Sequence, residues 1–86
     1  MNNSIRYNGK LNVIGNVIRK YRLSANLSQD DVSSKLLLLG INIHPKSYQR
    51  LENGERAIRD YELGAIAKVL NVSTDELLKD FMKDLI

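Results

Sequence analysis

The chain has 86 residues, with 43% hydrophobic and 27% charged side chains, the composition of one small globular domain. It has no cysteine and one histidine, which excludes disulfide bonds, thiolate metal sites and a histidine cluster. We therefore expect no metal and no cofactor. The longest apolar run is Leu36–Leu39, far short of a membrane span, and the first residues lack the apolar core of a secretory signal. These features favour a cytoplasmic protein with no membrane partner.

Charge is distributed unevenly along the chain. Residues 1–59 carry ten Lys and Arg against four Asp and Glu, whereas residues 60–86 carry three against six. The front of the chain therefore has a net charge of +6 and the rear a net charge of −3. A basic front suits a protein that binds a polyanion, although small chains also show such asymmetry by chance.

The first helical pattern spans residues 12–25. Its apolar residues follow the spacing i, i+3, i+4, i+7 of one helix face. They are Ile14, Val17, Ile18 and Tyr21. Residues 1–11 have no periodicity, so we expect a flexible N-terminal arm. Its two cations, Arg6 and Lys10, either reach nucleic acid or are simply solvated.

Capping signals predict the next two helices. Ser28 is suited to cap a helix over residues 28–39, with Leu27 and Val32 as a hydrophobic staple. Pro45 is favoured at the first position of a helix, and Asn53-Gly54 is a left-handed stop, which predicts a short helix over residues 45–53.

The remaining pattern predicts helices over residues 60–70 and 74–83. Ser73 and Glu76 fit a capping box at the start of the last helix. Gly64 lies inside the preceding helix, where glycine costs about 1 kcal/mol relative to alanine, so we expect it to pack closely against a neighbour. The apolar residues after Asp80 are candidates for a dimer surface.

The outward face of the helix at 45–53 is entirely polar. Tyr48 and Leu51 share one face and are expected to pack inward. The outward side chains all carry hydrogen-bond donors, and they are Lys46, Ser47, Gln49, Arg50 and Asn53. Arginine and lysine suit guanine, and glutamine suits adenine, in the major groove.

Four segments together resemble the Cro/phage-repressor (XRE-like) helix-turn-helix family. They are Ile18-Arg19-x-x-Arg22, Leu27-Ser28-Gln29-x-x-Val32-Ser33, Tyr48 to Arg56 (YQRLENGER), and Ile66 to Leu78 (IAKVLNVSTDELL). The segment Leu37 to His44 is about two residues longer than in the simplest members, as in a longer-turn variety. The resemblance implies an all-α, five-helix, lambda-repressor-like domain over residues 12–86.

The resemblance also implies roles for individual residues. In this architecture the second helix crosses the phosphate backbone and the third enters the major groove. We expect the third helix to read bases through Lys46, Ser47, Gln49 and Arg50. Phosphate contacts are expected from Gln29, His44, Asn53, Arg56 and Arg59. The alternative role for His44 is to cap the helix. The alternative for Arg56 and Arg59 is simple solvation. The resemblance implies a structural salt bridge between Arg22 and Glu52.

These features predict a sequence-specific, double-stranded DNA-binding regulator of transcription, with repression as the expected role and a homodimer as the expected state. The alternative is a helical protein-interaction module, antitoxin-like or accessory, that has lost specific DNA binding. An enzyme is disfavoured because the chain has neither a glycine-rich phosphate loop nor a carboxylate pair away from a helix cap. We expect no small-molecule domain.

Overall fold

The computed structural model describes residues 7–85, which form five α-helices. The helices are α1 (Gly15–Ser24), α2 (Gln29–Leu38), α3 (Pro45–Glu52), α4 (Asp60–Leu70) and α5 (Thr74–Asp84). The all-α, five-helix prediction is confirmed, and each helix lies within three residues of its predicted bounds. Within residues 7–85 the only β pairing is an isolated bridge between Tyr7 and Lys10.

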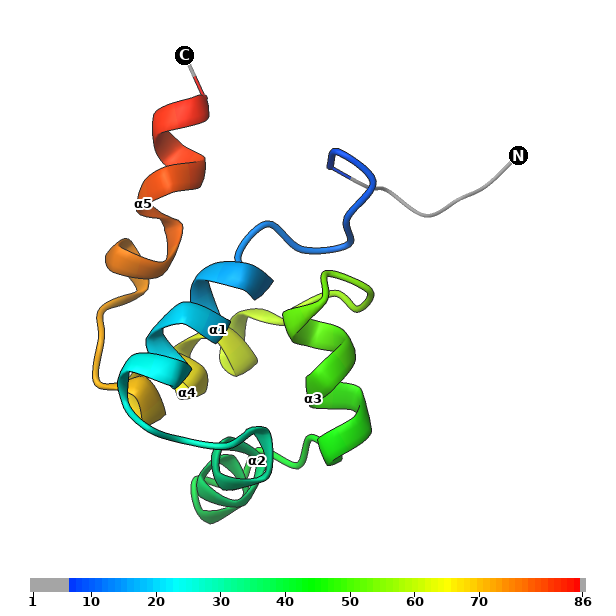
Figure 1. Ribbon diagram of the computed structural model, residues 1–86, viewed down its shortest axis with the longest axis vertical. Helices are drawn as coiled ribbons and strands as arrows, with labels where there is room; N and C mark the ends of the chain where they lie inside the picture. The colour runs from blue at the N-terminus through cyan, green and yellow to red at the C-terminus, as the bar shows by residue number, and fades with distance from the viewer. Residues whose placement is uncertain (1–6, 86) are drawn as a thin grey trace.

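The first four helices surround the core, and α5 packs against α4 (Figure 1). Helix α2 contacts both α3 and α4, while α1 contacts α3 and α4. The largest fully buried side chains come from all five helices, and they are Ile18, Val32, Leu36, Tyr48, Leu51, Ile66 and Leu77. Helix α3 is thus held from two sides, by α1 and α2.

Serine caps begin α2 and α5. The Ser28 hydroxyl accepts from the Asp31 amide at 2.9 Å, and the Asp31 carboxylate accepts from the Ser28 amide at 2.8 Å, which completes a capping box. The Ser73 hydroxyl accepts from the Glu76 amide at 3.0 Å. The capping box predicted there is incomplete, because the Glu76 carboxylate instead accepts from the Tyr21 hydroxyl at 2.9 Å and joins α5 to α1.

Helices α1 to α4 end in the same way. Just beyond each helix lies a left-handed residue, and its amide and the next amide along the chain donate back into the last turn. This is the pattern of the Schellman motif, which satisfies carbonyls that the helix itself leaves free. The left-handed residues are Asn26, Gly40, Gly54 and Asn71, with φ between 56° and 82°. Only the stop at Gly54 was predicted from the sequence.

Part of the segment expected to form a flexible arm contacts the body of the protein. Tyr7 and Lys10 exchange backbone hydrogen bonds across a turn, and the Tyr7 ring meets Phe81 edge to face with ring centroids 5.3 Å apart. Arg6 and the residues before it lie outside the described part of the chain. The domain limits at residues 11 and 12 stay a prediction.

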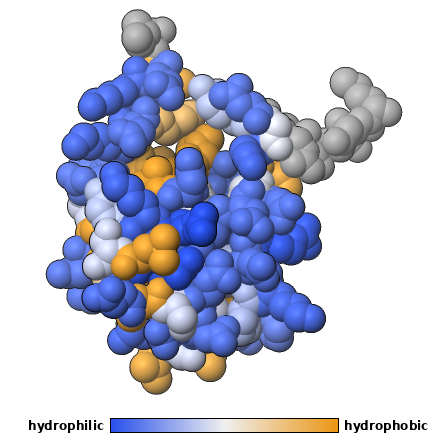
Figure 2. All heavy atoms as spheres, viewed as in Figure 1, coloured by the Kyte–Doolittle hydropathy of each residue, from blue (hydrophilic) through white to orange (hydrophobic). Residues whose placement is uncertain are grey.

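The surface is mainly polar. In the view of Figure 2, hydrophilic residues dominate and hydrophobic residues form small patches. Among the described residues, the most exposed large apolar side chain is that of Leu38, next to Leu37 and Leu39 at the end of α2. Within residues 7–85 no helix is long and apolar enough to cross a membrane.

Two glycines occupy opposite environments. A Cβ on Gly15 would lie 2.5 Å from the Leu51 carbonyl oxygen and 2.6 Å from that of Glu52, so α1 and the end of α3 approach closely there. Gly64 is exposed, and a Cβ there would meet nothing within 4 Å. The expectation that Gly64 packs against a neighbour is therefore wrong.

The two glycines give a matched pair of substitutions. Gly15→Ala is expected to lower the free energy of unfolding by about 1–3 kcal/mol, because the added methyl group overlaps backbone atoms that side-chain rotation cannot move. Gly64→Ala is expected to raise it by about 1 kcal/mol, because alanine favours a helix interior. Urea unfolding of both variants measures these changes. A destabilised Gly64→Ala variant would contradict this description of α4.

Candidate nucleic-acid interface

Helix α3 begins at His44 and Pro45. The His44 ring accepts at Nδ1 from the Lys46 amide at 3.2 Å, and Pro45 occupies the first helical position, where no amide is needed. The capping alternative for His44 is thus observed, while its phosphate contact stays a prediction.

The two faces of α3 differ in burial as the sequence predicts. Tyr48, Leu51 and Glu52 are buried against α1 and α2. Four of the predicted contact residues are exposed, and they are Lys46, Gln49, Arg50 and Asn53. Ser47 is half-buried. One amino group of Arg50 donates to the Glu55 carbonyl oxygen at 3.3 Å, a long contact that leaves the exposed guanidinium other donors. This outward face combines positive charge with amide groups.

A buried carboxylate joins α3 to α1 and α2. The Arg22 guanidinium donates to both oxygens of Glu52, at 2.6 and 3.0 Å, and also to the Leu27 carbonyl oxygen at 2.9 Å. The Gln29 side chain, at the start of α2, donates to Glu52 at 3.0 Å. The ion pair implied between Arg22 and Glu52 is therefore present, and it also engages Gln29. The Gln29 amide is oriented by the base of α3 and retains a second N–H.

The electrostatics of this junction favour the charged pair. Burial alone would raise the pKa of Glu52, but the hydrogen bonds from Arg22 and Gln29 outweigh it and hold that pKa below its ordinary value. Burial raises the pKa of the Tyr48 hydroxyl, and the nearby Glu52 carboxylate raises it further. Glu52 therefore stays ionised and Tyr48 neutral near neutral pH.

A second ion pair follows α3. The Arg56 guanidinium donates to both oxygens of Glu62, at 2.9 and 2.8 Å, and to the Ala57 carbonyl oxygen at 2.9 Å. The hydrogen bonds from Arg56 lower the pKa of Glu62. Glu62 also accepts from the Arg59 amide at 2.9 Å, where it caps α4. Arg56 thus contributes to the scaffold, and its phosphate contact stays a prediction. The Arg59 guanidinium lies 3.5 Å from Glu62, and its side chain is 62% exposed.

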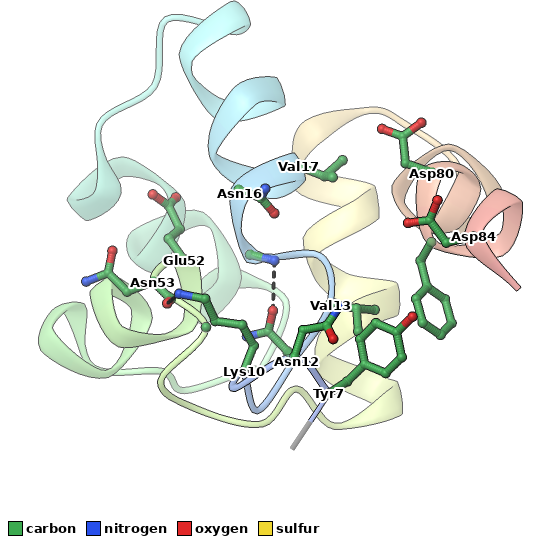
Figure 3. A pocket seen from close by; sticks show the side chains of 14 residues that line it. Tyr7, Lys10, Asn12, Val13, Asn16, Val17, Glu52, Asn53, Asp80 and Asp84 are labelled. Carbon is green, nitrogen blue, oxygen red and sulfur yellow. Dashed lines mark hydrogen bonds between the residues drawn. The ribbon is translucent and has the colours of Figure 1, made fainter. Parts of the chain in front are cut away.

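The residues just before α1 contact the end of α3. We call Lys10–Asn12 the strap. Figure 3 shows Lys10, Asn12 and Asn53 beside the same hollow, with Asp80 and Asp84 of α5 on its other side. The Asn12 amide donates to the carbonyl oxygens of Leu51 and Arg56, at 2.8 Å each.

Sequence reasoning missed Asn12 and Glu62. Asn12 carries a local signal, since asparagine often caps helices, but its partners lie 39 and 44 residues away along the chain. The pairing of Arg56 with Glu62 has no motif of its own. Of the predicted contact residues on α3, Lys46, Gln49 and Arg50 are exposed and Ser47 is half-buried, while Gln29 contacts the buried Glu52 at the end of the same helix.

Comparison with known proteins gives one match. A family model described as helix-turn-helix matches residues 18–77, which is more than half of the chain. The matched range begins in α1, includes α2 to α4 and ends in α5. No curated protein and no solved structure matches the chain.

Replacing the buried carboxylate tests this junction. Glu52→Gln is expected to lower the free energy of unfolding at pH 7 by about 3–5 kcal/mol, because Arg22 loses its charged partner. The folded-state pKa of Glu52 is depressed, so its contribution is present above the unfolded-state value and is lost as the pH falls through the folded-state value. The difference from the wild type should therefore shrink at pH 3.

Urea unfolding at pH 7 and pH 3 measures both differences. Glu55→Gln is the matched control, because Glu55 is exposed and makes no ion pair among the described residues. It should be neutral at both pH values. If the Glu52→Gln variant lost the same stability at both pH values, the charge of Glu52 would not be what stabilises the junction.

Proposed function

The chain belongs to the Cro/C1-type (XRE-like) helix-turn-helix family of DNA-binding transcription regulators, and on this premise we propose that it binds double-stranded DNA sequence-specifically and represses transcription. The observation that carries the proposal is the outward face of α3, where exposed Lys46, Gln49 and Arg50 present hydrogen-bond donors. In a helix-turn-helix motif such as that of α2 and α3, the second helix inserts into the major groove. The proposed role is non-enzymatic and cytoplasmic.

Base reading is proposed for four residues of α3. Arg50 and Lys46 donate to guanine O6 and N7, and Gln49 pairs with adenine through its amide. Ser47 is half-buried, and its short side chain is proposed to contact a base edge or a phosphate. Each bidentate contact of this kind contributes about 1–3 kcal/mol of discrimination against the wrong base.

Phosphate binding is proposed for residues that flank the two helices of this motif, α2 and α3. Gln29 lies at the start of α2, where free backbone amides and the helix dipole attract an anion, and its side-chain amide has one donor left. His44, Asn53 and Arg59 are exposed and belong to the proposed set. Arg56 completes it, with a guanidinium that also donates to Glu62 and Ala57.

The protein-interaction alternative predicts a different surface. A module that had lost DNA binding would carry acidic or large apolar residues on the outward face of α3. That face instead carries two cations and two amides, at Lys46, Arg50, Gln49 and Asn53. The experiment below distinguishes the two functions.

Selection of bound duplexes from a random DNA pool, followed by sequencing, tests the proposal. Enrichment of a palindrome with half-sites about one helical turn apart is expected. Retention should fall steeply with salt, because the bound phosphates release counterions. If no sequence is enriched at near-physiological salt, specific binding is excluded and the protein-interaction module becomes the better description.

Two substitutions separate base contacts from phosphate contacts. Arg50→Ala is expected to cost about 1–3 kcal/mol on the selected duplex and to relax preference at one base position. Gln29→Ala should weaken all duplexes alike. Lys79→Ala, on the exposed surface of α5, is the control for loss of a cation and should change neither. If Arg50→Ala weakened all duplexes alike and Gln29→Ala relaxed the preference for one base, the proposed placement of α3 in the groove would be wrong. Fluorescence anisotropy on selected and unrelated duplexes gives the affinities.

A homodimer is proposed because one eight-residue helix reaches few base pairs. Two copies on a palindrome place their reading helices about 34 Å apart. The end of α5 offers apolar side chains for self-association, with Met82 59% and Leu85 52% exposed.

Replacing both Met82 and Leu85 by glutamate is expected to convert the dimer to a monomer, because charges at an apolar interface lose their hydration. Analytical gel filtration measures the state. Leu38→Glu, at an exposed apolar residue of α2, is the control and should leave the dimer intact. An unchanged dimer in the double variant would place the interface elsewhere.

A further inference from the structure

The strap donates hydrogen bonds to the end of α3 and to the two residues that follow it. The Schellman motif already gives the Leu51 carbonyl oxygen one donor, the Gly54 amide at 3.1 Å, and the strap adds further donors. Each residue of the strap supplies one. The contacts are Lys10 Nζ to Asn53 O at 3.1 Å, Leu11 N to Gly54 O at 2.8 Å, and Asn12 Nδ2 to Leu51 O at 2.8 Å.

Asn12 uses both ends of its side-chain amide. The oxygen accepts from the backbone amides of Ile14 and Gly15, at 3.1 and 2.8 Å, where α1 begins. The nitrogen donates to Leu51 and Arg56. One short, planar group therefore connects the start of α1 to the end of α3 and to the loop that follows it.

The residues around this connection pack closely. Gly15 brings the backbone of α1 against the carbonyls of Leu51 and Glu52, where a Cβ would overlap them. On the other side, the Lys10 side chain lies against Gly54, where a Cβ would come within 2.6 Å of Lys10 Cδ. The end of α3 is thus enclosed between α1 and the strap.

Two anchors define the direction of a short helix. The first is the Arg22–Glu52 ion pair on the buried face, and the second is the strap at the C-terminal end. Without the strap, α3 keeps the ion pair and the packing of Tyr48 and Leu51 but loses the contacts that hold the carbonyls at its C-terminal end. A shift of this end displaces Arg50, about one helical turn away from Asn53, and a bidentate contact with a base tolerates little displacement.

We propose that Asn12 is a positioning residue for base reading, which sets the direction of α3 in the major groove through its two donor contacts. The inference rests on the proposed DNA-binding function. Asn12 touches no base in this arrangement. Its loss should therefore reduce discrimination between duplexes more than it reduces binding to DNA in general.

Two substitutions at Asn12 isolate the donor half of its amide. Asn12→Asp and Asn12→Ser both retain an oxygen that accepts from the amides at the start of α1, since aspartate and serine side chains accept from nearby backbone amides as asparagine does. Asn12→Asp is the harsher change, because it turns a carboxylate oxygen toward two carbonyls; Asn12→Ser serves if that variant fails to fold. Ser73→Ala removes a cap from α5, far from α3, and controls for a general loss of stability.

The readout is the ratio of affinities for the selected and an unrelated duplex, with the base preference at each position. The Asn12 variants should lose roughly tenfold in this ratio, the discrimination of one bidentate contact, with the loss concentrated at the base that Arg50→Ala also relaxes. Ser73→Ala should keep the wild-type ratio. Asn12 variants that fold and keep this ratio within about twofold would overturn the inference.

Amide hydrogen exchange provides a readout that needs no DNA. Loss of the donors should speed exchange at Asn53, Gly54 and Glu55, whose amides close the last turn of α3, while α2 amides stay protected. If the wild type selects no DNA sequence, the proposed function fails, and this measurement alone decides whether Asn12 holds α3. Unchanged exchange at these three amides would then show that it does not.

Discussion

The fold depends on one buried carboxylate, that of Glu52. It receives hydrogen bonds from Arg22 on α1 and Gln29 on α2, while its own backbone ends α3. Taking a carboxylate and a guanidinium out of water is costly, and the cost is offset only when both find well-placed partners. The three helices can therefore pack only where these groups meet. The ion pair fixes where α3 lies relative to α1, and the hydrogen bond from Gln29 fixes where it lies relative to the start of α2.

This constraint links the two kinds of contact that DNA recognition requires. Contacts to phosphate position a protein on the duplex, and contacts to base edges specify the sequence. Here Gln29, proposed for phosphate, is hydrogen-bonded to the same short helix that carries Arg50, proposed for bases. The outward residues of α3 make few contacts of their own, so their direction is set by what the inward residues and the strap hold.

Much of this arrangement could be predicted because it depends on local patterns. Spacing of apolar residues and capping signals indicated all five helices, Ser28 and Pro45 marked the starts of α2 and α3, and burial of Tyr48 followed from its position opposite the polar face. Contacts between residues far apart in sequence leave no such pattern. The donors of Asn12 to α3, and the pairing of Arg56 with Glu62, depend on how helices cross. The prediction for Gly64 was wrong for a different reason. A glycine inside a helix either marks a close approach of two backbones or has no packing role, and the sequence does not distinguish the two. Gly15, at the start of α1, is the glycine that a close approach requires.

The contact between Tyr7 and Phe81 has a practical consequence for engineering. It joins Tyr7, the first described residue, to the last part of α5, and in Figure 1 both ends of the described chain lie on the side away from the first turn of α3. A short peptide from Leu85 to Tyr7 could close the described residues into a ring there, because neighbouring ends are what circular permutation needs. A fluorescent label at the end of α5 would lie remote from the first turn of α3 (Figure 1), which is proposed to face the groove.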